Sequence, residues 1–375
     1  DSYNVAAGYF AGNAITTGVD NTLIGGGAGD ALTDADNNVA VGRSALGSDT
    51  LGSKSTAVGR GALGAQNFTT ATDSNNTAVG YTAGNSVTTG TYNSFLGAAA
   101  GLNVTTGANN TAVGALALES TTVGTNNVAV GQASLFENIL GSKSIAVGRG
   151  TLQNQNYTTA TDAFNTAVGH EAGNDVTTGL RNTLIGGLAG DALTDADSNV
   201  AVGANALGAD TLGSKSIAIG QGALFNQNFT TATDSHNVAI GHESGLSVTT
   251  GVGNTFVGSL AGDGTNDGNN NTAVGYFALS ANCGNDNTAV GLFALGVCTG
   301  TNNTGLGKDA AAALTSGGNN LFLGKDSGRT GSPGGNVTTQ SNGIYLGDEN
   351  ISAAHIQVDW TVASDQRDKT DFTAL

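Results

Sequence analysis

Two nearly identical acidic turns hold the densest set of metal-ligating side chains in this sequence. They read DALTDADNN from residue 30 and DALTDADSN from residue 191. Clustered carboxylates and Asn carbonyls are the hard oxygen ligands that Ca²⁺ prefers. The alternative is a solvated turn in which these side chains bond only to the local backbone. The candidate calcium ligands are Asp34, Asp36, Asp195 and Asp197.

No group of side chains indicates catalysis on a substrate. The four histidines do not cluster along the sequence. The GSKS segments at residues 52, 141 and 213 lack the Gly-Lys-[Ser/Thr] order of a phosphate-binding P-loop. We therefore expect no enzyme activity and no cofactor other than calcium in the acidic turns.

Three further segments are candidates for ligand binding because they interrupt a regular spacing. They read QNFTTATD, QNYTTATD and QNFTTATD from residues 66, 155 and 227, and each adds four residues to a repeat. Each carries one aromatic residue, Phe68, Tyr157 or Phe229. Loops on a rigid scaffold often carry binding sites, so these rings are candidate contacts for a glycan. Alternatively, each ring folds back and caps its own loop.

These segments belong to a repeat that covers almost the whole chain. Its core is N-[T/V/I]-[A/L/F]-[V/I/L]-G, and we call the final residue the marker glycine. The spacing between markers is mostly 17 residues. The twenty marker glycines are Gly8, Gly25, Gly42, Gly59, Gly80, Gly97, Gly114, Gly131, Gly148, Gly169, Gly186, Gly203, Gly220, Gly241, Gly258, Gly275, Gly291, Gly307, Gly324 and Gly347. A larger duplication relates residues 21–80 to residues 182–241 with an offset of 161.

The repeat predicts an all-β fold, a parallel β-solenoid of about 20 coils over residues 1–347. Seventeen residues are too few for a βαβ unit but suit a coil of two short strands and two turns. Coils stacked about 4.8 Å apart would form a rod on the order of 95 Å long. Each coil would depend on its neighbours for a core.

Two apolar columns precede the marker glycine, and strand alternation directs them to opposite faces. We expect the residue just before the glycine, such as Val79, to face the coil interior. We expect the residue before that, such as Ala78 or Phe95, to face another copy of the chain, because a strand that is apolar on both faces is buried on both. Closed symmetry then favours a homotrimeric rod. Four residues before the glycine, Asn predominates and predicts a stacked side-chain ladder, as at Asn76, Asn110 and Asn271.

The net charge of the chain disfavours two classes of binding partner, and its cysteine content bears on disulfide bonding. The net charge is −17, which disfavours nucleic acid and anionic membrane surfaces. No apolar run is long enough to span a bilayer, so no membrane insertion is expected. The two cysteines, Cys283 and Cys298, are either buried thiols or a disulfide between neighbouring coils. The chain begins at Asp1 and is expected to be a fragment of a longer protein.

The repeat over residues 4–347 resembles the heads of trimeric autotransporter adhesins, which are trimeric parallel β-rolls. The segment NGIYLGDENISAAHIQVDWTVASDQRDKTDF, residues 342–372, resembles the approach to the intramolecular chaperone domain of phage tail fibres and tailspikes, and looks most like fibres of marine cyanophages. Residues 348–363 would be a C-terminal β strand and connector, with Trp360 as a packing anchor at the trimer axis. Residues 364–375 would begin the chaperone motif.

That second resemblance implies a single self-cleavage between Ala363 and Ser364, with Ser364 as the nucleophile and Lys369 as its helper. The chain ends 12 residues into the motif, counting from Ser364. Either cleavage takes place elsewhere, or Ser364 only begins a connecting segment.

Together these features predict the structural and adhesive shaft of an extracellular phage tail fibre in the virion. It would space the virion from its host and present or form a receptor-binding surface. The expected partners are two further copies of the chain, other tail proteins, and a host cell-surface glycan or protein. A bacterial trimeric surface adhesin is the alternative, and a polysaccharide-degrading tailspike is a third hypothesis.

Overall fold

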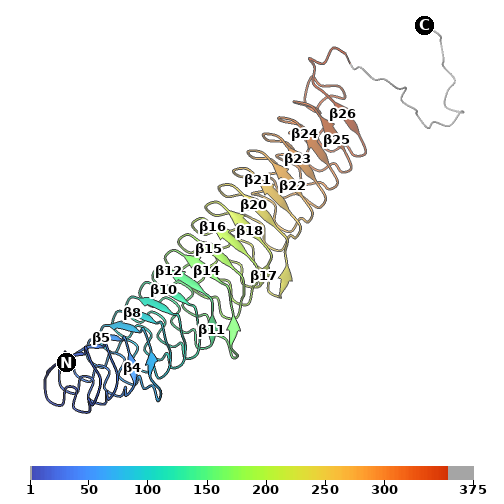
Figure 1. The fold of residues 1–375 in the computed structure, drawn as a ribbon. Coiled ribbons are helices and arrows are strands. Elements are labelled where there is room, and N and C mark those ends of the chain that lie inside the picture. Colours follow the sequence, from blue (N-terminus) through green and yellow to red (C-terminus); the bar gives the residue numbers. More distant parts are fainter. Residues whose placement is uncertain (1, 354–375) are drawn as a thin grey trace, which may run out of the picture.

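Twenty three-residue strands, each ending just before a marker glycine, stack into one parallel sheet along a rod (Figure 1). The computed structural model describes residues 2–353. Successive strands pair in register, for example Ala57 with Ala78 and Ala78 with Phe95. The strands of this sheet are β1 (Val5–Ala7), β2 (Thr22–Ile24), β3 (Val39–Val41), β5 (Thr56–Val58), β7 (Thr77–Val79), β8 (Ser94–Leu96), β9 (Thr111–Val113), β10 (Val128–Val130), β12 (Ile145–Val147), β14 (Thr166–Val168), β15 (Thr183–Ile185), β16 (Val200–Val202), β18 (Ile217–Ile219), β20 (Val238–Ile240), β21 (Thr255–Val257), β22 (Thr272–Val274), β23 (Thr288–Val290), β24 (Thr304–Leu306), β25 (Leu321–Leu323) and β26 (Ile344–Leu346).

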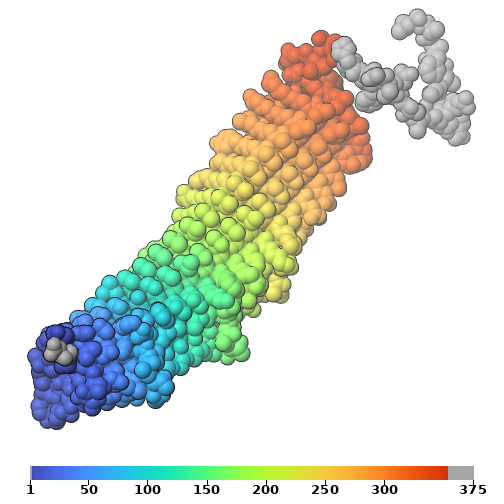
Figure 2. All heavy atoms as spheres, in the orientation of Figure 1, coloured from blue at the N-terminus to red at the C-terminus, as the bar shows by residue number. Residues whose placement is uncertain are grey.

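The predicted all-β parallel solenoid is thus confirmed, and Figure 2 shows its coils as regular layers. The sequence predicted a second strand in every coil, but within residues 2–353 it occurs only in the three coils with four inserted residues and in the coil just before each of them. These strands form three separate pairs, β4 (Gly52–Ser53) with β6 (Thr72–Asp73), β11 (Gly141–Ser142) with β13 (Thr161–Asp162), and β17 (Gly213–Ser214) with β19 (Thr233–Asp234).

Left-handed backbone conformations explain why most coils have only one strand. After the marker glycine, the chain repeatedly takes positive φ, as at Thr82 (51°) and Gly84 (58°). Such residues interrupt an extended conformation. The backbone groups still pair from coil to coil, for example Gly84 N with Ala100 O at 2.9 Å. The far wall of the solenoid is therefore a stack of hydrogen-bonded turns.

The marker glycine is required by the closeness of the coils. Gly42 has a φ of +135°, and a Cβ there would lie 2.5 Å from the carbonyl oxygen of Gly59 on the next coil. No L side chain fits such a position. The invariant glycine of the repeat therefore sets the closest approach between coils.

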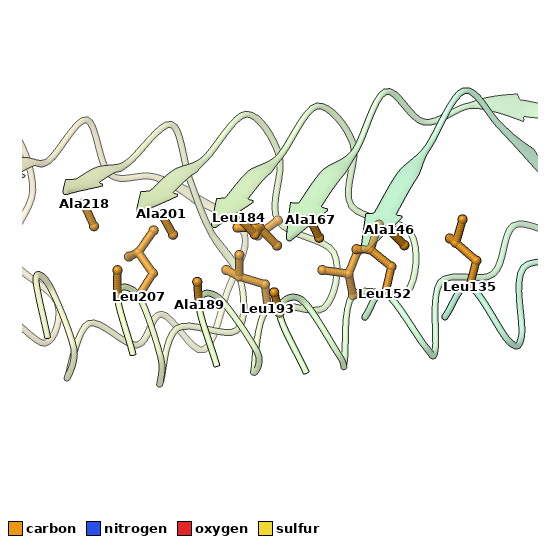
Figure 3. Close-up of a cluster of buried hydrophobic side chains, with 14 of the residues drawn as sticks. Leu135, Ala146, Leu152, Ala167, Leu184, Ala189, Leu193, Ala201, Leu207 and Ala218 are labelled. Carbon is orange, nitrogen blue, oxygen red and sulfur yellow. The ribbon is translucent and has the colours of Figure 1, made fainter. Parts of the chain in front are cut away.

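The two columns before the marker glycine point opposite to the sequence-based expectation. The central residue of each strand faces the core, and Ala78 and Phe95 are 0% and 1% exposed. The residue just before the glycine faces outward, and Leu96 is 51% exposed. Figure 3 shows central strand residues pointing into the coil at Ala146, Ala167, Leu184, Ala201 and Ala218. The inward and outward assignments are therefore reversed.

Candidate functional site

The side chains of the Asn column bond two backbone groups of the following coil, as Asn110 shows. Asn110 is fully buried. Its Oδ1 accepts a hydrogen bond from the backbone N of Asn127 at 3.0 Å, and its Nδ2 donates to the carbonyl of Gly124 at 2.8 Å. These side chains satisfy buried backbone groups that turns would otherwise leave unpaired. The ladder is therefore formed mainly by amide-to-backbone bonds, and direct amide-to-amide bonds join some steps, such as Asn320 Nδ2 to Asn303 Oδ1 at 3.0 Å.

The other two predicted ladder residues, Asn76 and Asn271, differ in whether the Nδ2 group has a partner. Asn76 Nδ2 donates to Gly90 O at 2.7 Å, and its Oδ1 accepts from the backbone N of Asn93 at 2.9 Å. Asn271 Oδ1 accepts from Asn287 N at 2.9 Å, but its Nδ2 is buried without a partner. Asn287 is also followed by a coil of 16 residues, and its Nδ2 donates to Gly300 O at 2.9 Å, so the shorter coil alone does not explain the missing partner of Asn271.

The candidate calcium ligands bind the preceding coil instead of converging on one point. Asp36 Oδ1 accepts from the backbone N of Val19 at 2.8 Å, and Asp197 Oδ1 accepts from Leu180 N at 2.7 Å. Asp34 accepts a hydrogen bond from the hydroxyl of Thr17. Asp195 accepts one from Thr178 Oγ1 at 2.5 Å. Across residues 2–353, no three His, Cys, Asp or Glu side chains gather as a metal site would require.

The aromatic residues of the three longer coils lie inside the rod. Phe68, Tyr157 and Phe229 are 5%, 6% and 5% exposed, so they present no ring face to a sugar. Tyr157 donates its hydroxyl to Gly179 O at 2.9 Å, and burial raises the pKa of Tyr157. The rings fold back over their own coils, which was the alternative interpretation of the sequence.

A buried polar cluster lies beneath each of these rings. In the cluster beneath Phe229, Asp210 Oδ2 accepts from Gln227 Nε2 at 2.5 Å, and Gln227 Nε2 also lies 2.8 Å from Ser216 Oγ. Burial raises the pKa of the Asp210 carboxyl. In the cluster beneath Tyr157, Asn138 takes the place of Asp210 and accepts from Gln155 Nε2 at 3.2 Å. These interior groups stabilise the longer coils and offer no access to a ligand.

The outward residues before the marker glycines form one continuous uncharged surface, which we call the outward stripe. From β2 to β26 every one is Val, Ile or Leu, and none is buried. They are Ile24, Val41, Val58, Val79, Leu96, Val113, Val130, Val147, Val168, Ile185, Val202, Ile219, Ile240, Val257, Val274, Val290, Leu306, Leu323 and Leu346. An exposed apolar surface of this length marks an interaction site.

At the C-terminal end, a hollow of about 340 Å³ is lined by charged residues that neutralise one another. Lys325 Nζ lies 3.0 Å from Asp326 Oδ2, and Arg329 Nη1 lies 3.0 Å from Asp326 Oδ1.

The predicted strand with Trp360 and the cleavage residues Ser364 and Lys369 lie outside the described residues. Cys283 and Cys298 are buried free thiols rather than a disulfide.

Comparison with known proteins does not assign this rod. No family, curated protein or solved structure matches the chain. In the described part of the chain, no helix has the length and apolarity to cross a membrane.

Proposed function

We propose that the chain is one strand of a parallel homotrimeric fibre shaft, in which three outward stripes pack around a common axis. The observation that carries this proposal is the apolar outward stripe on a chain of net charge −17. A surface of Val, Ile and Leu brings copies together without placing like charges against each other. The remaining acidic surface faces solvent and keeps separate fibres apart.

The face available to sister chains is the outward stripe and not the column that contains Ala78 and Phe95. The sequence suggested that Ala78 and Phe95 face sister chains, but both are buried within their own coil. The residues that remain to be covered are their outward neighbours, such as Val79 and Leu96. Burying a Val or Leu side chain contributes on the order of 1.5–3 kcal/mol when complete, and the stripe repeats this gain at each coil.

In function, we infer a mechanical spacer that holds an adhesive tip or surface away from the structure to which it is attached. The C-terminal resemblance to phage fibres favours the virion over a bacterial surface. In the C-terminal hollow, Asp326 and Asp348 lie within 4.0 Å of Lys325 Nζ and are ion-paired, which gives the polysaccharide-degrading alternative the least support.

The test is the solution mass of the chain and of a stripe variant. The chain has a mass of 36.7 kDa, so a trimer would have a mass of about 110 kDa, three times this value. We expect a trimer by light scattering at micromolar concentration. The triple variant Val113→Glu, Val130→Glu and Val147→Glu places one charge per coil along the stripe, and we expect it to be monomeric with its β spectrum by circular dichroism intact.

A matched control carries the same three charges off the stripe. Thr89→Glu, Thr106→Glu and Val123→Glu also lie on successive coils at exposed positions, and this variant should remain trimeric. A monomeric parent chain, or a stripe variant that remains trimeric, would contradict the proposal.

A further inference from the structure

A groove on the N-terminal coils holds the only arginines of the described chain that lack an acidic partner. Ten Lys and Arg residues lie within residues 2–353. Eight of them lie within 4.0 Å of a carboxylate oxygen. The other two are Arg43 and Arg60, which occupy the same position on consecutive coils, directly after Gly42 and Gly59. In an acidic chain, two adjacent unpaired guanidinium groups are an anion-binding arrangement.

The groove consists of two adjoining hollows of about 370 and 240 Å³ that share Ser44, Gly61 and Asn85. Arg43, Arg60 and Tyr81 line the smaller one, with Thr82. Gly47 and Gly64 line the larger one, and the absence of side chains at these glycines leaves it hollow. Asp30 lines the larger hollow, whereas both arginines line the smaller one.

Tyr81 gives the groove an exposed aromatic wall. The ring is 55% exposed. Arg60 Nη1 donates to Tyr81 Oη at 3.2 Å, and the guanidinium carbon lies 5.6 Å from the ring centroid. Asn85 Nδ2 donates to Gly61 O at 2.8 Å, which fixes this amide at the groove. The groove thus combines cations, hydroxyls and an aromatic face.

The internal duplication supplies a natural comparison for this groove. Residues 21–80 and 182–241 differ at 13 of 60 aligned positions, and none of the 13 residues in the first copy is buried. Six of these differences line the groove, at Arg43, Ser44, Ser48, Arg60, Gly64 and Ala65. The second copy has Ala204, Asn205, Ala209, Gln221, Phe225 and Asn226 at these positions. Its hollow includes Phe225, Leu246 and Glu243 and contains no cation.

The longer coil between Gly148 and Gly169 also lacks a free cation. Arg149 corresponds to Arg60, but its Nη1 lies 2.9 Å from Glu171 Oε1 and 3.2 Å from His170 Nε2. Three equivalent places on one scaffold therefore have three surface chemistries, and only the first leaves arginine available.

We propose that the groove of Arg43, Arg60 and Tyr81 binds a carboxylate-bearing sugar of an acidic polysaccharide. The guanidinium groups present paired N–H donors that match a carboxylate, and the tyrosine ring packs on the apolar face of a sugar ring. Ser44, Thr82 and Asn85 lie within the groove to bond sugar hydroxyls. At physiological salt, charges more than about 8 Å away are largely screened, so the acidic remainder of the rod does not prevent binding. The proposal deepens the adhesive part of the proposed function, although the groove forms within one chain and does not require the trimer.

The experiment uses the full chain and measures binding of trigalacturonate by equilibrium dialysis, with its methyl-esterified form as the uncharged control. The variant Arg43→Ala, Arg60→Gln and Tyr81→His takes its residues from the second copy, so the coil is known to accommodate them. We expect trigalacturonate to bind, the ester to bind at least about tenfold more weakly, and the variant to lose binding to the same extent. Thermal melting should be unchanged.

The reverse variant tests sufficiency. Ala204→Arg, Gln221→Arg, Phe225→Gly, His242→Tyr and Glu243→Thr rebuild the groove on the second copy, and the number of sites per chain should rise from one to two.

The proposal is overturned if trigalacturonate does not bind, if the ester binds equally well, or if the first variant retains binding. Equal competition by inorganic sulfate would show a general anion site and would also overturn the sugar assignment. Because light scattering reads the trimer separately, failure of one proposal is distinguishable from failure of the other.

Discussion

The ring of Phe95 occupies the space that a side chain at residue 101 would fill. A Cβ on Gly101 would lie 2.5 Å from Cε1 of this ring, and a Cβ on Gly84, one coil earlier, would lie 2.8 Å from Cδ2. The same relationship joins Leu23 to Gly29. Where the strand supplies Ala, as at Ala40, the far wall supplies Leu46 instead. A large side chain from one wall thus fills the core, and Phe95 also fills the space beside Gly84 in the preceding coil, where both Ala78 and Gly84 are small.

Because a large side chain on one wall takes the place of one on the other, moving it between the walls has a predictable effect on stability. Phe95→Ala alone should destabilise the rod by about 3–5 kcal/mol, because it leaves a cavity. Gly101→Leu alone should destabilise by about 1–3 kcal/mol or more through overpacking against the ring. The combination Phe95→Ala with Gly84→Leu and Gly101→Leu rebuilds the alternative layer and should recover at least half of the lost stability. Chemical unfolding followed by circular dichroism measures each value.

The backbone conformation itself does not forbid this swap. Leu46 and Leu63 already occupy the equivalent position with φ of 51° and 49°. If the triple variant is no more stable than Phe95→Ala, a large side chain on the far wall does not replace one on the strand. The contact between Phe95 and the two glycines would then not determine the stability of the core.

Loss of one ladder residue should loosen the rod locally. Asn110→Ala removes the acceptor for Asn127 N and the donor to Gly124 O, both in a buried environment. We expect a loss of about 2–4 kcal/mol, because two buried polar groups lose their partners. Hydrogen exchange at the Asn127 amide should accelerate more than at distant coils. The control Asn103→Ala removes an exposed amide, and similar acceleration in that variant would argue against the ladder.

A partly buried carboxylate predicts a pH-dependent stability. Burial raises the pKa of Asp263 to about 6, and its Oδ1 is buried without a partner. The raised folded-state pKa means that this carboxyl favours the folded chain below its ordinary pKa of 3.8, and that the contribution is lost as pH rises through 6. Asp263→Asn should therefore be more stable than the parent by about 1 kcal/mol at neutral pH.

The measurement is the difference in melting temperature between parent and variant as a function of pH. The difference should shrink toward pH 4, where the parent is protonated. Asp267→Asn removes the same charge from an exposed position on the same coil. An advantage of Asp263→Asn that is constant across pH, or that is matched by Asp267→Asn, would show that burial of the carboxylate is not the cause.

The two cysteines should be inert in the folded chain. Cys283 is 2% exposed and Cys298 is 0% exposed. Burial raises the pKa of Cys283 to about 11 and also raises the pKa of Cys298, so the reactive thiolate is scarce at pH 8. We expect negligible reaction with a disulfide reagent in native buffer and two equivalents in concentrated guanidinium chloride. An exposed Thr89→Cys variant provides the positive control. Rapid labelling of native parent thiols, or no labelling after unfolding, would contradict the structure.

The coil itself was readable from the sequence because it follows from local geometry. A glycine at nearly every seventeenth position allows only one stacked arrangement, since Gly42 must approach Gly59 without a Cβ. The Asn column and the absence of helix follow from the same period. The twenty marker positions therefore predict the number and order of strands in the main sheet, whereas the second strand expected in every coil is absent from most coils.

Strand alternation alone does not predict which of the two apolar columns faces the core. Val79 and Ala78 are both apolar, and alternation says only that they face opposite sides. A signal was present in the pairing of large strand residues with glycines six positions later, as at Phe95 and Gly101. This covariation of size identifies the inward column, because only residues that touch need to compensate in volume.

The sequence by itself determined the period, the strand positions and the coil-to-coil register, because these depend on backbone contacts that repeat with the chain. Only the tertiary structure decided which column faces the core, that Phe68 is buried, and that Arg43 and Arg60 lack an acidic partner while Arg149 has one. The physical reason is that these properties depend on side chains from adjacent coils, where a change of one residue, such as Thr82 against Glu171, reverses the local charge balance.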